Sequence, residues 1–260
     1  MRAIPDNNLA YAVLITLASG GQGSGFFLNA PPSGYLVTAA HVLYDEKGAL
    51  RSDVLTVRAF PADPDDPGWV EYRVHLTEVA KASNLLKHAS QDIVALRLFK
   101  LAQLPNDSGL FVTMQPGVIT RSTTTGGQVG VGVGSLKRFK DVQVANQVVV
   151  FGFPGSVGLK HMPQFDYQRP LLRHGIVSAK YAERKTLVLD CAVYPGNSGG
   201  PVLEIEQEGL TWHYRVAGVI AEYVPFAMVE TDPKAVLLSN SGYAVATSVD
   251  PLLELIGVAT

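Results

Sequence analysis

Short apolar segments separated by turn-forming residues recur through this chain, and they restrict its fold more than any other feature. Each segment is rich in Val, Ile, Leu, Phe or Tyr, with Gly, Pro, Asn or Asp between segments. Many short strands at such spacing are typical of β-sandwiches and β-barrels rather than α/β folds. The sequence therefore predicts an all-β protein with strands over 11–16, 25–28, 35–38, 54–60, 70–76, 93–98, 142–151, 175–179, 186–189, 202–205, 214–220 and 243–246.

The size and charge of the chain narrow the classes of function. Its 260 residues are enough for one large or two small β domains, and 47% hydrophobic against 17% charged residues favours a folded globular protein. The formal net charge is −2 without a long basic run, so we expect no nucleic acid or membrane partner. Cys191 is the only cysteine, which excludes an intrachain disulfide bond.

One glycine-rich segment is suited to holding a reactive serine. It reads Gly196-Asn197-Ser198-Gly199-Gly200-Pro201, and its glycines permit a tight turn that closely approaches a substrate. A serine hydroxyl is a weak nucleophile unless a base removes its proton during attack. The amide groups of Gly196 and Ser198 could converge beside that hydroxyl and stabilise an oxyanion. We therefore interpret Ser198 as a candidate nucleophile.

Two upstream segments supply the partners that such a serine needs. His41 ends the segment Thr38-Ala39-Ala40-His41, interpreted as a strand that leads into one helical turn, and is the candidate general base. Asp92 directly precedes an apolar strand and is the candidate for orienting the imidazole, ahead of Asp53 in a charged turn. The chain order His, Asp, Ser is one of the known orders for a catalytic triad, and we expect Ser198 within hydrogen-bond reach of His41.

These segments resemble those of trypsin-like serine peptidases of the chymotrypsin fold. Within that family the resemblance is strongest to the disulfide-free branch of Do-like heat-shock proteases. Further similarity lies in 149–155, which resembles a turn that opens the second barrel, and in the strand 175–179. The resemblance implies two six-stranded antiparallel β-barrels: 1–115 carrying His and Asp, a linker over 116–145, and 146–260 carrying Ser. A short C-terminal helix follows, for which the sequence offers Asp250 as N-cap, Pro251 at the first position and Gly257 at the end. Residues 101–141 and 156–171 match no segment that we can assign.

The resemblance implies a serine endopeptidase that hydrolyses peptide bonds through an acyl-enzyme, with protein or peptide as substrate and neither metal nor organic cofactor. It also places the substrate pocket near residues that carry no trypsin-like Asp, so specificity for Lys or Arg does not carry over. These pocket candidates are Ala192, Val193, Ala221, Glu222 and Tyr223, with the orientation of the last three left open. The sequence lacks the Ile-Val-Gly-Gly motif of digestive zymogens, and we expect no PDZ domain.

Two alternative functions are compatible with parts of the sequence. Gly196-Asn197-Ser198-Gly199-Gly200 also fits the nucleophile elbow of α/β-hydrolases, but a strand rather than a helix follows it here. The main alternative is a catalytically silent or latent protease fold that serves as a binding module. The scattered histidines show no metal-ligand spacing.

The compartment is a further expectation. A single cysteine fits a reducing compartment, and the apolar run 9–20 is interpreted as a first strand rather than as a signal peptide. We therefore expect a cytoplasmic protein. The resemblance adds a possible regulatory protein partner, which no residue of the sequence identifies.

Overall fold

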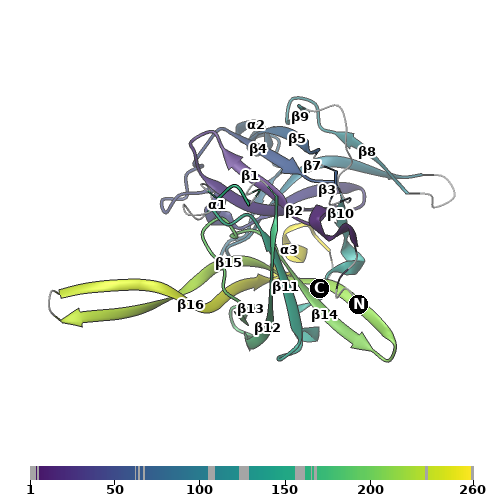
Figure 1. Cartoon of the computed structure of the whole chain (residues 1–260). Helices are drawn as coiled ribbons and strands as arrows, with labels where there is room; N and C mark the ends of the chain where they lie inside the picture. Colours follow the sequence, from purple (N-terminus) through teal and green to yellow (C-terminus); the bar gives the residue numbers. More distant parts are fainter. Residues whose placement is uncertain are drawn as a thin grey trace.

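The computed structural model describes residues 4, 6–61, 63, 65–66, 68–104, 109–122, 129–155, 162–164, 166, 169–231 and 234–258. Side chains of 6–7 and 228–237 are not described. Figure 1 shows two β units, one above the other, with the N-terminal unit uppermost. Most described residues lie in strands, and the predicted all-β, double-barrel fold class is confirmed.

The N-terminal unit is a ten-stranded sheet rolled into a half-barrel. Its path runs β6-β7-β3-β2-β1-β4-β5-β9, with β8 paired to β7 and β10 paired to β2. These strands are β1 (Val13–Leu17), β2 (Gln22–Ala30), β3 (Ser33–Thr38), β4 (Val54–Ala59), β5 (Val70–His75), β6 (Leu85–Lys87), β7 (Val94–Gln103), β8 (Leu110–Met114), β9 (Ile119–Arg121) and β10 (Gly130–Gly132). Two short helices accompany them, α1 (Ala40–Leu43) and α2 (Leu76–Lys81).

The C-terminal unit is a closed barrel in the order β11-β12-β13-β16-β15-β14. Its strands are β11 (Gln147–Gly152), β12 (Leu171–Tyr181), β13 (Thr186–Asp190), β14 (Pro201–Glu208), β15 (Thr211–Thr231) and β16 (Lys234–Ser248), followed by α3 (Asp250–Leu255). Figure 1 shows β15 and β16 continuing beyond the barrel as a long two-stranded arm. The prediction ended one strand at 220 and began the next at 243. Pairing instead continues outward to Thr231 opposite Lys234.

Apolar side chains form a core in each unit and a third layer between the units. β2 illustrates the cause, because alternate side chains of a strand face opposite sides. Phe27 belongs to the core of the N-terminal unit, whereas Phe26 and Leu28 belong to the layer between the units. Residues of β11, β14 and α3 complete that layer. The two units are therefore joined by continuous apolar packing, which sets the relative positions of loops on either side.

The segment predicted as a linker, 116–145, contains strands that pair with the N-terminal sheet. β9 pairs with β5, and β10 pairs in parallel with β2. Two 3₁₀ turns follow, Val133–Ser135 and Phe139–Asp141. Part of the glycine-rich run, 126–128, lies outside the described residues.

A buried ion cluster attaches the chain after β10 to the second barrel. Lys137 Nζ lies 3.1 Å from Glu204 Oε1 and 2.9 Å from Glu206 Oε2, and the Lys137 and Glu204 side chains are almost completely buried. Asn146 Nδ2 donates to the same Glu204 oxygen at 2.6 Å. The hydrogen bond from Lys137 lowers the pKa of Glu206 below its ordinary value. Glu204 and Glu206 lie on β14, the strand that begins just after Ser198, so this cluster anchors that strand.

The C-terminal helix is present, but its predicted N-cap is wrong. Val249 is the N-cap residue, with no side-chain capping hydrogen bond, and Pro251 is the second helical residue rather than the predicted first. The carboxylate of Asp250 instead accepts a hydrogen bond from the Phe139 amide at 2.6 Å. The long-range partner therefore takes the oxygen that local sequence would assign to the helix.

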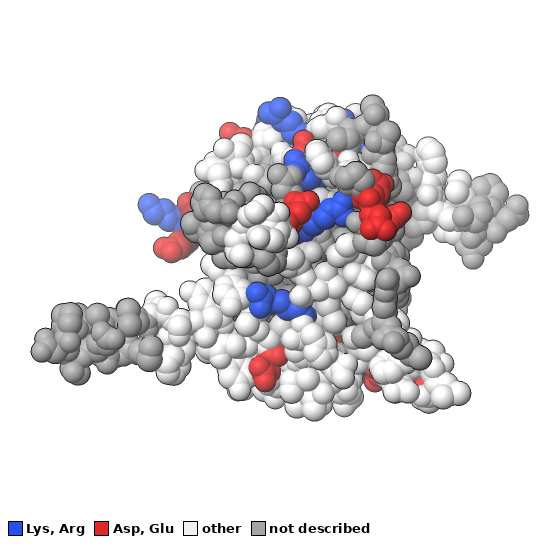
Figure 2. Space-filling view, in the orientation of Figure 1, with Lys and Arg blue, Asp and Glu red and all other residues white. Residues whose placement is uncertain are grey.

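Charges of both signs lie close together on the surface. Figure 2 shows Lys and Arg side chains beside Asp and Glu side chains on the face drawn, without one sign covering that face. Among the described residues, no helix has the length and apolar character required to cross a membrane.

Candidate active site

His41 projects from the one-turn helix α1 directly after β3. Ala39, Ala40 and Leu43 are buried there, so the turn is packed against the core while His41 faces outward, with 47% of its side chain exposed. Arg51 Nε donates to the carbonyl oxygens of His41 at 3.0 Å and Tyr44 at 2.8 Å. These bonds satisfy carbonyl groups that a short helix leaves without intrahelical partners.

Asp92 reaches His41 because of the register between β3 and β7. Thr38 pairs with Val94 in this antiparallel pair, so the residues after Thr38 and those before Val94 emerge at the same sheet end. Asp92 Oδ2 lies 2.6 Å from His41 Nδ1, and Asp92 Oδ1 accepts from the His41 amide at 2.9 Å. Both carboxylate oxygens therefore orient the histidine, and Nδ1 is the ring nitrogen they engage.

The turn that carries Ser198 depends on its glycines. Gly196 has φ +100° and Gly199 has φ +87°, in the region that other residues rarely adopt. A Cβ atom at Gly196 would lie 2.2 Å from the Phe153 carbonyl oxygen, and one at Gly199 would lie 2.1 Å from that of Ser24. Ser198 thus lies on a tight loop pressed against both units, directly before β14, as predicted.

The hydroxyl group of Ser198 does not point to His41. It donates to the carbonyl oxygen of Ala221 at 3.3 Å, and no hydrogen bond joins Ser198 and His41 among the described residues. The two side chains nevertheless line one cleft, together with Asp92. Rotation about the Ser198 Cα–Cβ bond moves the hydroxyl between staggered positions without moving the backbone. In the structure the His41–Asp92 hydrogen bond is therefore formed, whereas the Ser198 hydroxyl is bonded to Ala221 instead of His41.

The backbone N–H groups of Gly196 and Ser198, in this turn, have no hydrogen-bond acceptor within the described chain. The Pro195 carbonyl accepts from the Gly155 amide at 2.8 Å, and the Asn197 carbonyl accepts from the Gly200 amide at 2.9 Å. In a trans peptide the N–H points opposite to the C=O, so the Gly196 and Ser198 amides point away from those partners. Within the described chain neither amide donates a hydrogen bond. Two donors are thus available beside Ser198.

The cleft beside the serine, of about 520 Å³, has a predominantly apolar wall. Of the predicted pocket residues, Val193, Ala221, Glu222 and Tyr223 line it, whereas Ala192 does not. Glu222 is exposed in the cleft. The sequence analysis missed three further lining residues, Tyr194, Pro195 and Ile220, although each is adjacent in sequence to a predicted pocket or oxyanion-hole residue.

The pocket wall is held by contacts that the sequence did not reveal. Asn240 Nδ2, on β16, donates to the Val193 carbonyl at 2.5 Å. The Arg173 guanidinium lies 4.5 Å from the centre of the Tyr194 ring, in cation–π geometry. Both contacts join the segment before Ser198 to distant strands and fix the shape of the cleft.

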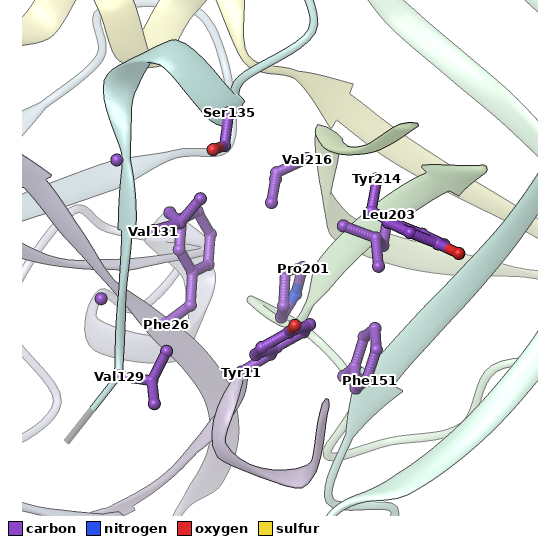
Figure 3. A pocket seen from close by; sticks show the side chains of 12 residues that line it. Tyr11, Phe26, Val129, Val131, Ser135, Phe151, Pro201, Leu203, Tyr214 and Val216 are labelled. Atoms are coloured by element: carbon purple, nitrogen blue, oxygen red, sulfur yellow. The ribbon is translucent and has the colours of Figure 1, made fainter. Parts of the chain in front are cut away.

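A second cavity lies between the units and contains none of the three candidate triad residues. Figure 3 shows side chains of both units around this space of about 230 Å³, including Tyr11, Phe26, Phe151, Pro201 and Tyr214. Burial raises the pKa of Tyr11 above its ordinary value, and the electrostatic effect of the nearby Tyr214 adds to this rise. Among the described residues that line this cavity, none carries a carboxylate, imidazole or amine.

Metal ligands are not gathered at either site. Among the residues whose structure is described, no three His, Cys, Asp or Glu side chains are arranged to hold a metal ion.

Comparison with known proteins assigns the family. The sequence pattern of the family described as "Trypsin-like peptidase domain" matches residues 23–210, a range that includes His41, Asp92 and Ser198. The chain belongs to this family, and its fold agrees with that assignment. Membership supports a serine protease at the level of the family. No curated protein matches the chain significantly.

Proposed function

We propose that this protein is a serine endopeptidase with Ser198 as nucleophile, His41 as general base and Asp92 as the orienting carboxylate. The observation that carries the proposal is one cleft lined by the bonded His41–Asp92 pair and by Ser198, beside which the Gly196 and Ser198 amides donate no hydrogen bond within the described chain. Removing the Ser198 proton as it attacks is the role that a neutral imidazole so oriented performs.

The proposed reaction uses these groups in sequence. His41 accepts the Ser198 proton while the Ser198 oxygen attacks the peptide carbonyl carbon, and the Gly196 and Ser198 amides stabilise the resulting oxyanion. His41 then donates the proton to the leaving amine, and the C–N bond breaks to leave an acyl-enzyme. Water, deprotonated by His41, attacks the ester, and the Ser198 oxygen leaves with the proton. Asp92 stabilises the imidazolium in both steps.

The lining of the cleft supports a preference for uncharged, mainly apolar side chains before the scissile bond. Val193 and Ala221 are buried and apolar, and burying an apolar substrate group contributes about 0.8 kcal/mol per CH₂. Discrimination between similar side chains is then about 10–200-fold per methylene. A peptide-library profile tests this, and cleavage after acidic residues would contradict it. Cleavage after Lys or Arg would instead assign Glu222 as the selecting residue.

The test of the proposed nucleophile is labelling with a fluorophosphonate followed by peptide mapping. We expect the label on Ser198, with none in Ser198→Ala and much less in His41→Ala. A folded wild-type protein that takes no label and cleaves no peptide would contradict the proposal. That result would favour a latent protease fold used as a binding module, for which the Ser198 hydrogen bond to Ala221 is the supporting observation.

Kinship to the Do-like branch, a cytoplasmic location and control by a protein partner remain separate proposals. Fractionation of the native host tests the location. Co-purification from the same extract tests for the partner.

A further inference from the structure

Ser24 of β2 makes four hydrogen bonds at the boundary between the two units. It has no exposed surface. Its amide donates to the Ser198 carbonyl at 2.8 Å, and its hydroxyl donates to the Gly196 carbonyl at 2.6 Å. The same hydroxyl accepts from the Phe153 amide at 3.0 Å. One residue of the N-terminal unit thus holds two carbonyl groups of the turn that carries Ser198.

These two carbonyl groups belong to Gly196 and Ser198, whose amides donate no hydrogen bond within the described chain. The backbone orientations of Gly196 and Ser198 are therefore restrained on both sides. The Gly155 and Gly200 amides donate to the carbonyl groups of the residues that precede Gly196 and Ser198. Ser24 donates to the carbonyl groups of Gly196 and Ser198 themselves. Other bonds also hold the turn, among them the Tyr194 amide to Asn197 Oδ1 at 3.0 Å and the Gly199 amide to the Ile220 carbonyl at 2.7 Å. Among the described residues, however, only Ser24 donates to the Gly196 and Ser198 carbonyls.

Ser24 is also connected to the histidine. Its carbonyl oxygen accepts from the Thr38 hydroxyl at 2.7 Å, and Thr38, fully buried, ends β3 just before the turn that carries His41. Ser24 therefore contacts the supporting segments of both His41 and Ser198.

We propose that Ser24 is a positioning residue that aims the Gly196 and Ser198 amides at the oxyanion. The inference rests on the proposed function for its catalytic consequence, whereas the restraint itself is independent of activity. An oxyanion forms only after attack, so misdirected amides weaken binding of the transition state more than binding of the substrate. Losing the Ser24 hydroxyl, which frees the Gly196 carbonyl but leaves the backbone bond to Ser198, therefore lowers kcat rather than raising KM.

The experiment compares Ser24→Ala with Ser248→Ala. Ser248 is a matched control, because it is equally buried and its hydroxyl has no hydrogen-bond partner among the described residues. We expect Ser24→Ala to lower kcat about 10–100-fold, the scale of a small misplacement in an active site, with KM changed less than about twofold. Affinity for a peptidyl boronate should fall by a similar factor, and Ser248→Ala should match the wild type in all three.

A second measurement remains informative when Ser24→Ala is unstable or the wild type inactive. Hydrogen exchange of the peptide spanning 194–200 should be faster in Ser24→Cys, whose larger, weakly bonding thiol replaces the hydroxyl, and unchanged in Ser248→Ala. Equal exchange in Ser24→Cys and the wild type would overturn the restraint. Faster exchange with unchanged kcat, or a loss confined to KM, would overturn the catalytic role. Absence of turnover and labelling in the wild type counts against the proposed function alone.

Discussion

The two halves of the candidate site are built differently. His41 and Asp92 lie on an exposed rim, where the register of β3 and β7 brings them together and two short hydrogen bonds join them. Ser198 lies on a partly buried glycine turn whose backbone is held by Ser24 of the other unit, and its hydroxyl points to Ala221. The base half thus depends on pairing within one unit, whereas the nucleophile half depends on contacts between units.

The largest expected effect is a loss of kcat, which tests whether the two halves act together as one catalytic unit. Ser198→Ala and His41→Ala should each lower kcat by about 10⁴–10⁶-fold, and the double variant should lose no more than the worse single variant. The physical reason is that neither the nucleophile nor the base has a function without the other. Steady-state kinetics with a peptide substrate measure this. Hydrolysis that persists in purified Ser198→Ala would break the comparison outright.

The next effect concerns the base half alone. Asp92→Asn should preserve the fold but lower kcat by about 10⁴-fold, because the amide favours the wrong imidazole tautomer and no longer stabilises the imidazolium. Asp53→Asn is the matched control, since Asp53 is the competing candidate acid in the sequence. Both carboxylate oxygens that form hydrogen bonds with His41 belong to Asp92. Similar kcat values for the two variants would mean that Asp92 has no orienting role.

A smaller effect, on stability, tests how the strand after Ser198 is anchored. Lys137→Met should lower the free energy of unfolding by about 3–5 kcal/mol, because it leaves the fully buried Glu204 without its counter-charge. Lys81→Met removes an exposed ion pair with Glu78 and should change stability little. Urea denaturation measures both. Equal stabilities would show that the Glu204 cluster does not anchor the strand.

The smallest effect concerns Cys191, which lies just before the pocket wall. Burial raises the pKa of its thiol from 9.0 to about 11. Between these values the unfolded chain loses the proton and the folded chain keeps it, so stability should fall as pH rises from 9 to 11. The loss should not exceed about 3 kcal/mol. Thermal unfolding across this range should show a steeper decline for wild type than for Cys191→Ala, and parallel curves would refute the assignment.

Much of the fold was predictable because its signals are local. Each predicted strand core lies within an observed strand or overlaps one, since β-rich segments bounded by turn residues carry their own preference. The helical turn at His41 and the glycine turn at Ser198 were also predictable. At both, the backbone conformation restricts which residues fit, and the sequence shows those residues.

The features that could not be predicted depend on contacts between residues far apart in the sequence. Asp250 was predicted to cap its own helix but binds the Phe139 amide, and the arm of β15 and β16 extends past both predicted strand ends. The roles of Asn240 and Ser24 have no local signature, because a polar side chain can bind any backbone group that folding brings near.

The sequence by itself determined the residue types for the chemistry, their chain order and the strand-rich architecture. Only the tertiary structure decided that Asp92 binds His41 through both oxygens, that Ser198 bonds to Ala221, and that Ser24 restrains the nucleophile turn. The physical reason is range: propensity and steric limits act within a few residues, whereas a hydrogen bond of under 3 Å between residues 172 apart in sequence, as between Ser24 and Gly196, exists only once both units have packed.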